Sequence, residues 1–185
     1  MSDADRGRWD ERYAGVPLAE PGPPEPLRGR EALVPTSGRA LDVACGRGAA
    51  AVWLAERGLA VDAVDVSPVG LAAGAALARA RRVAGVRWWS HDLDAGLPEA
   101  CRGPYDVVVC QRFRDPALYP ALGAALAPGG LLAVTVLSVV GGPDGPFRAG
   151  PGELRSAFAG LDVLADVEGE GSASLLARRR DERRG

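Results

Sequence analysis

Two periodic patterns of apolar and polar positions alternate along most of this chain. From Arg39 onward, short runs of Ala, Val and Leu, typical of strands, are separated by Ala- and Leu-rich segments with helical spacing. The strand-like runs contain few polar residues, as expected of strands that helices bury on both faces of a sheet. The pattern therefore predicts an α/β fold with a mostly parallel sheet.

This alternating pattern predicts seven strands and four helices after Arg39. The strands are predicted over residues 40–44, 60–65, 86–90, 105–110, 131–137, 161–167 and 173–178. The helices are predicted over residues 49–57, 68–82, 116–126 and 151–159. Only a few small and acidic residues separate the last two strands, so we expect an antiparallel last strand. Pro128-Gly129-Gly130 is expected to end the third of these helices.

The segment before the first strand has a different character. Residues 5–13 predict a short helix with Trp9 and Tyr13 on one face, because side chains four positions apart are neighbours. Five prolines from Pro17 to Pro26 predict an extended linker, and residues 27–33 predict another short helix. We expect an N-terminal helical lid with a Pro-rich linker (1–38), one domain (39–178) and a charged tail (179–185).

Composition and charge narrow the class of protein. The net charge of -2 gives no reason to expect nucleic acid or an acidic membrane as a partner. No apolar run approaches the ~20 residues of a membrane span, and the N-terminus lacks the apolar stretch of a signal peptide. The three cysteines form no C-x-x-C, so no metal site is suggested. We expect a cytoplasmic protein, either a monomer or a homodimer.

The most informative motif follows the first predicted strand. Residues 41–48 read LDVACGRG, a strand that ends at glycines and turns into a helix. Glycines let the backbone approach a ligand, and the start of a helix supplies free N–H donors, so this unit indicates a nucleotide site. Two alternatives stay open: a tight turn without a ligand, or the G-x-G-x-x-A fingerprint of an NAD-binding fold.

Three further strand ends fall at the same edge of the predicted sheet. Asp65 ends the second strand ~20 residues after the glycines, where an acidic side chain can hold ribose hydroxyls. The third strand is followed by Ser90-His91-Asp92-Leu93 and the fourth by Cys110-Gln111-Arg112-Phe113. In an open α/β sheet, ligands bind at the carboxyl ends of the strands. We expect one site there.

The motifs, in this order, resemble those of class I S-adenosylmethionine-dependent methyltransferases. LDVACGRG resembles their first motif, VDAVDVS the second and HDL the adenine-contacting motif, while YDVVVCQ and LAPGGLLAVTVL resemble their fourth and fifth strands. RWDERYAG and GPFRAGPGELRSAFAGLDVL are similar to a narrower group, the tellurite-resistance-type (TehB-like) and thiopurine-type small methyltransferases. The resemblance implies a Rossmann-like methyltransferase fold whose cofactor is S-adenosyl-L-methionine and whose product is S-adenosyl-L-homocysteine.

The resemblance also implies roles for individual residues. Asp42, Ala44, Gly46 and Gly48 would hold the methionine half of the cofactor, with Cys45 in the same turn. Asp65 would hold the ribose, and Val66, Asp92 and Leu93 would surround the adenine. Cys110 and Gln111 would lie near the sulfonium, and Trp9 and Tyr13 would close the site, where aromatic faces stabilise a cation.

The acceptor side is less defined. The candidates are Arg112, Phe113, Arg114, Phe147 and Arg148. Methyl transfer is an in-line displacement that needs alignment and exclusion of water, so the sequence identifies no catalytic acid or base. His91, the single histidine, is interpreted as a solvated neighbour of the adenine rather than a base. The loop Glu168–Ser172 carries no His or Arg, so a metalloid substrate cannot be carried over from the TehB-like group.

These observations predict a methyltransferase acting on a small-molecule acceptor: a thiol, a chalcogen, an amine or a hydroxyl. Two alternatives remain: a cofactor-binding module without chemistry of its own, and an NAD-binding oxidoreductase. The identity of the acceptor and the use of a general base stay open.

Overall fold

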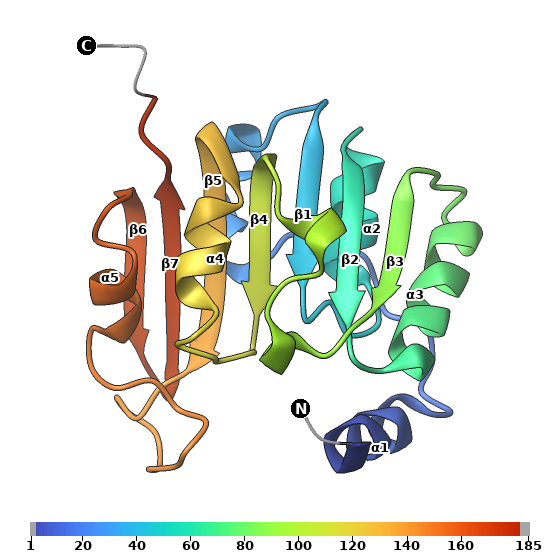
Figure 1. The fold of residues 1–185 in the computed structure, drawn as a ribbon, viewed down its shortest axis with the longest axis horizontal. Helices are drawn as coiled ribbons and strands as arrows, with labels where there is room; N and C mark the ends of the chain where they lie inside the picture. The colour runs from blue at the N-terminus through green and yellow to red at the C-terminus, as the bar shows by residue number, and fades with distance from the viewer. Residues whose placement is uncertain (1–2, 182–185) are drawn as a thin grey trace.

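The protein is built around one twisted, seven-stranded sheet, seen face-on in Figure 1. The computed structural model describes residues 3–181. The strands are β1 (Arg39–Val43), β2 (Ala60–Asp65), β3 (Val86–Ser90), β4 (Tyr105–Gln111), β5 (Leu126–Leu137), β6 (Asp162–Gly169) and β7 (Ser172–Arg178). Their order is β3-β2-β1-β4-β5-β7-β6, and only β7 runs antiparallel to its neighbours. The predicted parallel sheet with an antiparallel last strand is therefore confirmed.

Helices cover both faces of this sheet. They are α1 (Asp3–Tyr13), α2 (Ala49–Glu56), α3 (Pro68–Ala80), α4 (Tyr119–Ala124) and α5 (Glu153–Ala157), with short 3₁₀ turns η1 (Glu25–Leu27), η2 (Glu31–Leu33), η3 (Leu93–Ala95) and η4 (Glu99–Cys101). Leu54 of α2 and Leu27 of η1 pack in one apolar cluster, whereas Leu122 of α4 and Leu154 of α5 pack in another. The alternation of strand side chains supplies both clusters from the same β-strands.

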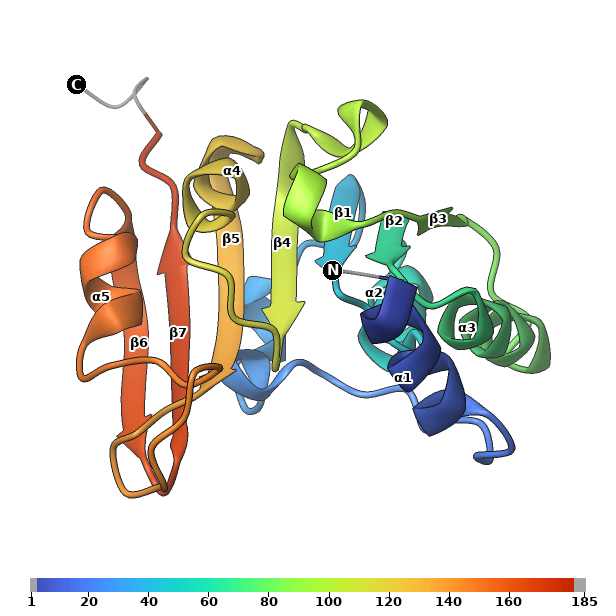
Figure 2. The ribbon, with the colours of Figure 1, turned by 60° about the horizontal axis from the view of Figure 1, so that its bottom comes forward.

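The N-terminal helix lies away from the two covering layers. Figure 2 shows α1 lying beside α3, against which it packs, at the edge where β1, β2 and β4 end. The predicted placement of Trp9 and Tyr13 on one face of this helix is confirmed, and their rings are stacked with centroids 5.5 Å apart. The helix thereby covers the same sheet edge at which the sequence motifs converge.

Three predicted helices differ from the structure. The helix predicted over 151–159 is shorter and spans only Glu153–Ala157. The helix predicted over 116–126 is shorter, because β5 already begins at Leu126. Pro128-Gly129-Gly130 lies inside that strand, since Gly129 and Gly130 exchange backbone hydrogen bonds of 2.9 Å with Arg179. The helix predicted over 27–33 is replaced by η1 and η2, because Gly29 between them has a φ of +72°.

A buried charge cluster joins the middle of the sheet. Asp62 of β2 is only 1% exposed. It accepts hydrogen bonds from Arg39, Arg87, the Trp89 indole and the Tyr105 hydroxyl, at 3.2, 2.8, 2.9 and 2.8 Å. Burial alone would raise the pKa of Asp62, but the hydrogen bonds from Arg87, Trp89 and Tyr105 outweigh it and lower the pKa. The cluster therefore links β1, β2, β3 and β4 through one ionised carboxylate.

Two arginines after β7 hold the C-terminal end of the sheet. Arg179 donates a side-chain hydrogen bond to the Leu126 carbonyl, and Arg180 pairs with Asp162. The last part of the predicted tail, residues 182–185, lies outside the described residues. The division into a lid (1–38), a domain (39–178) and a tail (179–185) stays a proposal. Within residues 3–181, no helix has both the length and the apolar character needed to cross a membrane.

Replacing Asp62 by Ala should destabilise the fold by roughly 3 kcal/mol, because it leaves the buried Tyr105 hydroxyl, the partly buried Trp89 indole and two guanidinium groups without their acceptor. Urea denaturation measures the change. Because the folded pKa of Asp62 is lowered, its contribution is present above the unfolded pKa and lost as pH falls through the folded pKa. Asp162→Ala is the matched control, since its ion pair with Arg180 is exposed and should matter by less than ~1 kcal/mol. Equal effects of the two substitutions would contradict the prediction.

Candidate functional site

The turn after β1 is held in a conformation that favours glycine. Ala44, Gly46 and Gly48 all have positive φ, at 54°, 53° and 73°. The turn is tied to β2 by a 3.0 Å hydrogen bond from the Cys45 N–H to the Val64 carbonyl. A Cβ on Gly46 would lie 3.0 Å from the Tyr13 hydroxyl, so glycine is needed there for the approach of α1.

Asp65 at the end of β2 holds this turn. Its carboxylate accepts from the Gly46 N–H at 2.7 Å and from the Ser67 N–H at 2.9 Å, and it is 6% exposed. Burial raises the pKa of Asp65, and the backbone hydrogen bonds from Ser67 and Gly46 offset part of the rise. A carboxylate has about four acceptor positions, so these two bonds leave capacity for a ligand's hydroxyl groups.

Asp42 of β1 is the least satisfied acid near the turn. It is 2% exposed, and its Oδ2 has no hydrogen-bond partner within the described residues. The pKa of Asp42 is raised to about 7. Burial is the main cause; a backbone hydrogen bond from Ala51 opposes the rise, and the charge of Asp65 adds to it. A buried, unsatisfied carboxyl oxygen is costly and favours a donor or a cation from a ligand.

Helix α1 is docked over the turn by a single acid. Asp10 accepts from the Ser67 hydroxyl and, at 3.4 Å, from the Val69 N–H. Tyr13 then lies between two glycines, because a Cβ on Gly70 would come within 2.9 Å of its ring. Burial, followed by the charge of Asp65, raises the pKa of Tyr13 to about 12, so its hydroxyl stays protonated.

These elements enclose a cavity of about 400 Å³. Nine of the predicted cofactor residues line it: Trp9, Tyr13, Asp42, Ala44, Cys45, Gly46, Asp65, Val66 and Gln111. Two predicted acceptor residues, Arg112 and Phe113, line it as well. The sheet therefore gathers residues from α1, β1, β2 and β4 around one space.

Four predicted cofactor residues lie outside the lining of this cavity. Gly48 packs against the ring of Trp88, which a Cβ would approach within 2.5 Å. Asp92 caps η3 by accepting from the Asp94 N–H at 3.0 Å, and Leu93 is buried in the core. Cys110 is also buried, and burial raises its pKa, so its thiol is not poised as a thiolate.

A second cavity, of about 720 Å³, opens beside the first at the same sheet edge. It is lined by the ends of β5 and β6, the β6–β7 turn and the linker: Glu25, Arg112, Val136, Leu137, Val167, Glu168, Gly169, Glu170, Gly171 and Ser172. Arg112 lines both cavities, so they meet at the loop after β4.

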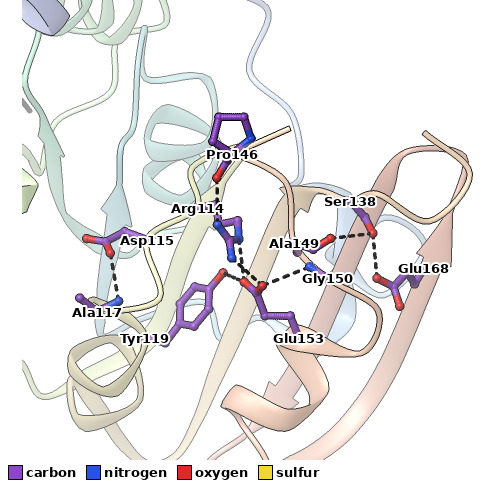
Figure 3. Close-up of polar contacts among 10 residues, drawn as sticks. All are labelled: Arg114, Asp115, Ala117, Tyr119, Ser138, Pro146, Ala149, Gly150, Glu153 and Glu168. Carbon is purple, nitrogen blue, oxygen red and sulfur yellow. Dashed lines mark hydrogen bonds and ion pairs between the residues drawn. The ribbon is translucent and has the colours of Figure 1, made fainter. Parts of the chain in front are cut away.

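The remaining acceptor candidates have other partners, as Figure 3 shows for Arg114. Its guanidinium donates two hydrogen bonds, of 2.8 and 2.7 Å, to Glu153, which also accepts from the Tyr119 hydroxyl at 3.0 Å. One nitrogen of Arg148 donates to the carbonyls of Ser138 and Gly171. Phe147 lines neither cavity and is 70% exposed. Arg114 and Arg148 therefore hold loops together.

The networks beside the second cavity also use acids. Figure 3 shows the Ser138 hydroxyl donating to Glu168 at 2.8 Å, and the other oxygen of Glu168 accepts from the Gly152 N–H at 2.9 Å. The Glu153 and Glu168 networks fix the loop between β5 and β6 from both sides. Within residues 3–181, no group of three or more His, Cys, Asp or Glu side chains is arranged to hold a metal ion.

Sequence reasoning missed the residues that seat the lid. Asp10 and Gly70 carry no motif signal, because their contacts join α1 to α3 across 57 or more positions of chain. The side-chain cap of Ser67, which accepts from the Gly70 N–H at 3.0 Å, was predictable from Ser67-Pro68, but its bond to Asp10 was not.

Comparison with known proteins identifies the domain. Residues 40–130 match the profile of the methyltransferase domain family. No protein with curated annotation matches the sequence significantly. The matched residues run from β1 into β5 and therefore include the glycine turn, Asp65 and the end of β4.

Solved structures share the fold at low identity. TehB from Haemophilus influenzae has a TM-score of 0.72 and 18% identity over 83% of this chain and 61% of that one. The [4+2]-cyclase SpnF has a TM-score of 0.71 and 20% identity over 97% and 96%. The magnesium protoporphyrin IX methyltransferase ChlM from Synechocystis PCC 6803, with S-adenosylmethionine bound, has 0.63 and 19% over 96% and 80%.

These likenesses concern the fold, and this chain spans 61% of the length of TehB. The match of residues 40–130 adds the domain family and, with it, S-adenosylmethionine as the cofactor. Residues 40–130 therefore form a domain of the methyltransferase family, and the chain around them has the fold of the class I S-adenosylmethionine-dependent methyltransferases.

Proposed function

We propose that the chain transfers the methyl group of S-adenosylmethionine to a small-molecule acceptor: a thiol, a chalcogen, an amine or a hydroxyl. The observation that carries the proposal is the cavity of about 400 Å³ under α1, whose lining includes Asp65 and Asp42, the latter with one buried carboxyl oxygen that has no hydrogen-bond partner within residues 3–181. A cavity lined by two buried acids suits a cationic ligand.

The residues around the cavity fit the cofactor. Asp42 offers an acceptor for the ammonium of the methionine half, and Asp65 has acceptor capacity left for ribose hydroxyls. Trp9 and Tyr13 supply aromatic faces for the sulfonium. Val66 lines the cavity where we assign the adenine. Asp92 and Leu93, which follow β3, are assigned to the same adenine, although they lie outside the lining of the cavity. When bound, the cofactor supplies an activated methyl group.

The chain's own contribution would be alignment and exclusion of water. α1 covers the cavity through the Asp10 contact with Ser67, and Tyr13 closes over Gly46. Gln111 lines the cavity from the end of β4, and its side-chain oxygen accepts from the Glu25 N–H at 3.2 Å, which ties the linker to the site. An in-line displacement draws most of its acceleration from such positioning.

The second cavity is our candidate for the acceptor side, because it meets the cofactor cavity at Arg112. Three carboxylates, Glu25, Glu168 and Glu170, line it against the one guanidinium of Arg112. Since Arg114 and Arg148 are engaged by Glu153 and by backbone carbonyls, they do not offset this excess. We therefore propose a neutral or cationic acceptor with a small apolar body facing Val136 and Leu137.

The two alternatives make different predictions. A binding module would hold the cofactor without turnover, and an NAD-dependent enzyme would be stabilised by NADH. Asp42, buried and unpartnered, favours a ligand with an ammonium over a dinucleotide. The cytoplasmic location and the monomeric or homodimeric state stay predictions.

Saturating S-adenosylhomocysteine should raise the melting temperature, because a ligand that binds only the native state stabilises it. A screen of thiols, selenite, tellurite, amines and catechols with labelled donor should then yield labelled methyl product. Asp65→Ala should weaken the thermal shift markedly by removing the acceptor assigned to the ribose. Stabilisation by NADH and not by S-adenosylhomocysteine would contradict the proposal, and binding without turnover across the panel would favour the non-catalytic module.

The affinity for S-adenosylhomocysteine should rise with pH through about 7, by up to about tenfold per unit below that value, because only ionised Asp42 attracts the ligand's ammonium. Without ligand, the raised pKa of Asp42 has the opposite effect on folding. The free energy of unfolding falls as pH rises from the unfolded pKa of ~4 to about 7, because the folded state holds the Asp42 proton more tightly. Isothermal titration calorimetry from pH 5.5 to 8 measures the affinity. Asp42→Asn should flatten the profile, and an unchanged slope in this variant would rule out Asp42 as its origin.

The charge of the acceptor should control its turnover. Among mercaptoethylamine, mercaptoethanol and mercaptoacetate, compared per thiolate, kcat/KM should fall in that order by about fivefold per step, since a unit charge ~7 Å away at an effective dielectric of ~40 contributes ~1 kcal/mol. Glu25→Gln with Glu170→Gln should reduce the differences. Glu56→Gln, which pairs with Arg81 away from both cavities, is the matched control. A preference for mercaptoacetate would exclude an acidic acceptor site.

A further inference from the structure

The turn between β6 and β7 does not follow the residue preferences of its backbone. Two residues join the strands, and both have positive φ, 52° at Glu170 and 77° at Gly171. Two-residue hairpin turns of this kind favour Asn-Gly, Asp-Gly or Gly-Gly, because other side chains are strained at positive φ. Glutamate at the first position therefore costs stability, and such local conflicts concentrate at functional sites.

No contact within residues 3–181 compensates for this strain. The carboxylate of Glu170 has no hydrogen bond and no ion pair there, and the side chain is exposed. Its neighbour is held firmly, because the Gly171 N–H donates to the Val140 carbonyl at 2.9 Å. The Gly171 carbonyl accepts from the Ser138 N–H at 2.9 Å and from the Arg148 guanidinium at 3.2 Å. The turn is thus fixed in place, while the Glu170 carboxylate can still accept hydrogen bonds.

Glu170 lines the second cavity, which meets the cofactor cavity at Arg112 after β4. The β6–β7 turn and the end of β4 lie at the same edge of the sheet, the lower edge in Figure 1. In the order β4-β5-β7-β6, the turn lies between two and three strand spacings, roughly 10–14 Å, from the end of β4. Glu170 is therefore distant from the meeting point of the two cavities, where the methyl group would be transferred.

The three acids of the second cavity differ in position and in what they already bind. Both oxygens of Glu168 accept hydrogen bonds from the loop between β5 and β6. Glu25 lies beside β4, since its N–H donates to the Gln111 side chain at 3.2 Å. Glu170 lies near the opposite end of the cavity. Arg148 lies beside this turn, but its guanidinium donates to backbone carbonyls.

We propose that Glu170 is a specificity-determining residue that binds a cationic group of the acceptor, remote from the atom that receives the methyl group. The inference rests on the proposed function and specifies its substrate: a molecule with a nucleophile at one end and an ammonium group at the other. Allowing for the length of the Glu170 side chain, the two groups would be about 6–10 Å apart, or roughly five to eight bonds of extended chain at ~1.2 Å per bond.

Binding at two points would align the nucleophile with the cofactor. A thiolate at the near end forms its bond to the methyl carbon while the bond between that carbon and the sulfonium breaks, and the electron pair stays on the sulfur of S-adenosylhomocysteine. The ammonium of the acceptor keeps its proton and its charge throughout. A carboxylate on a rigid two-residue turn can hold that ammonium with a charge-assisted hydrogen bond.

The strain at Glu170 can be tested without any acceptor. Asn tolerates positive φ, so Glu170→Asn should raise the melting temperature of the full chain by about 2–4 °C. Arg82→Asn is the matched control, because Arg82 is exposed, has a φ of 56° and lines neither cavity; it should stabilise the chain similarly. A lower melting temperature for Glu170→Asn would show that the glutamate holds the turn, and would overturn the inference.

Selectivity is tested with 6-mercaptohexylamine and 6-mercaptohexanol, assayed with labelled S-adenosylmethionine and compared per thiolate. The amine should have at least about tenfold higher kcat/KM, as expected for a charge-assisted hydrogen bond. Glu170→Asn should bring this ratio close to one, and Arg82→Asn should keep it. The shorter pair, mercaptoethylamine and mercaptoethanol, cannot span the cavity, so its ratio should change much less in Glu170→Asn.

Binding provides a readout that does not depend on methyl transfer. With saturating S-adenosylhomocysteine, calorimetric titration of 6-mercaptohexylamine should show at least about tenfold weaker binding to Glu170→Asn than to the unchanged chain. Equal affinities would overturn the inference, as would a selectivity ratio that survives in Glu170→Asn and collapses in Glu25→Gln. A lack of turnover with every thiol, while Glu170→Asn still weakens binding, would count against the proposed function alone.

Discussion

The hydrogen bond of 2.7 Å from the Gly46 N–H to the Asp65 carboxylate is the contact on which the site depends. It joins the ends of β1 and β2, which are neighbours only because the two strands are parallel. The same carboxylate accepts from Ser67, whose hydroxyl in turn meets Asp10 of α1. Turn, second strand and lid are therefore connected through one buried acid, and a change at Asp65 would alter all three.

The chain contains arginine and no lysine. In the structure, the arginines near the site have two different roles. Arg114 and Arg148 bridge loops after β4 and β5, so both guanidinium groups are already hydrogen-bonded within the protein. Arg12 and Arg112 line the cofactor cavity and have no ion pair within residues 3–181. The lining of the cofactor cavity therefore carries both signs of charge, whereas the lining of the second cavity is net negative. The second of these features carries the proposal for the charge of the acceptor.

Strand and motif positions were predictable because their signals are local. The run before Asp42, the turn at Gly46 and the cap at Ser67 each need only a few consecutive residues to be recognised. Errors occurred where a distant partner changes a local preference. Pro128-Gly129-Gly130 reads as a helix end, but Arg179 of the last strand pairs with it and extends β5. For Arg114, a candidate for the acceptor side, no local signal indicates that Glu153, 39 positions away, pairs with it.

The sequence alone determined the order of strands and helices, the glycine turn and the acids that follow β1 and β2, since apolar periodicity and backbone conformation are properties of short segments. Only the tertiary structure decided that α1 lies over that turn, that residues of α1 and of the ends of β1 and β2 line one cavity, and that Asp62 gathers four donors inside the sheet. These depend on contacts between residues far apart in the chain, which form only when burial of the two sheet faces brings the segments together.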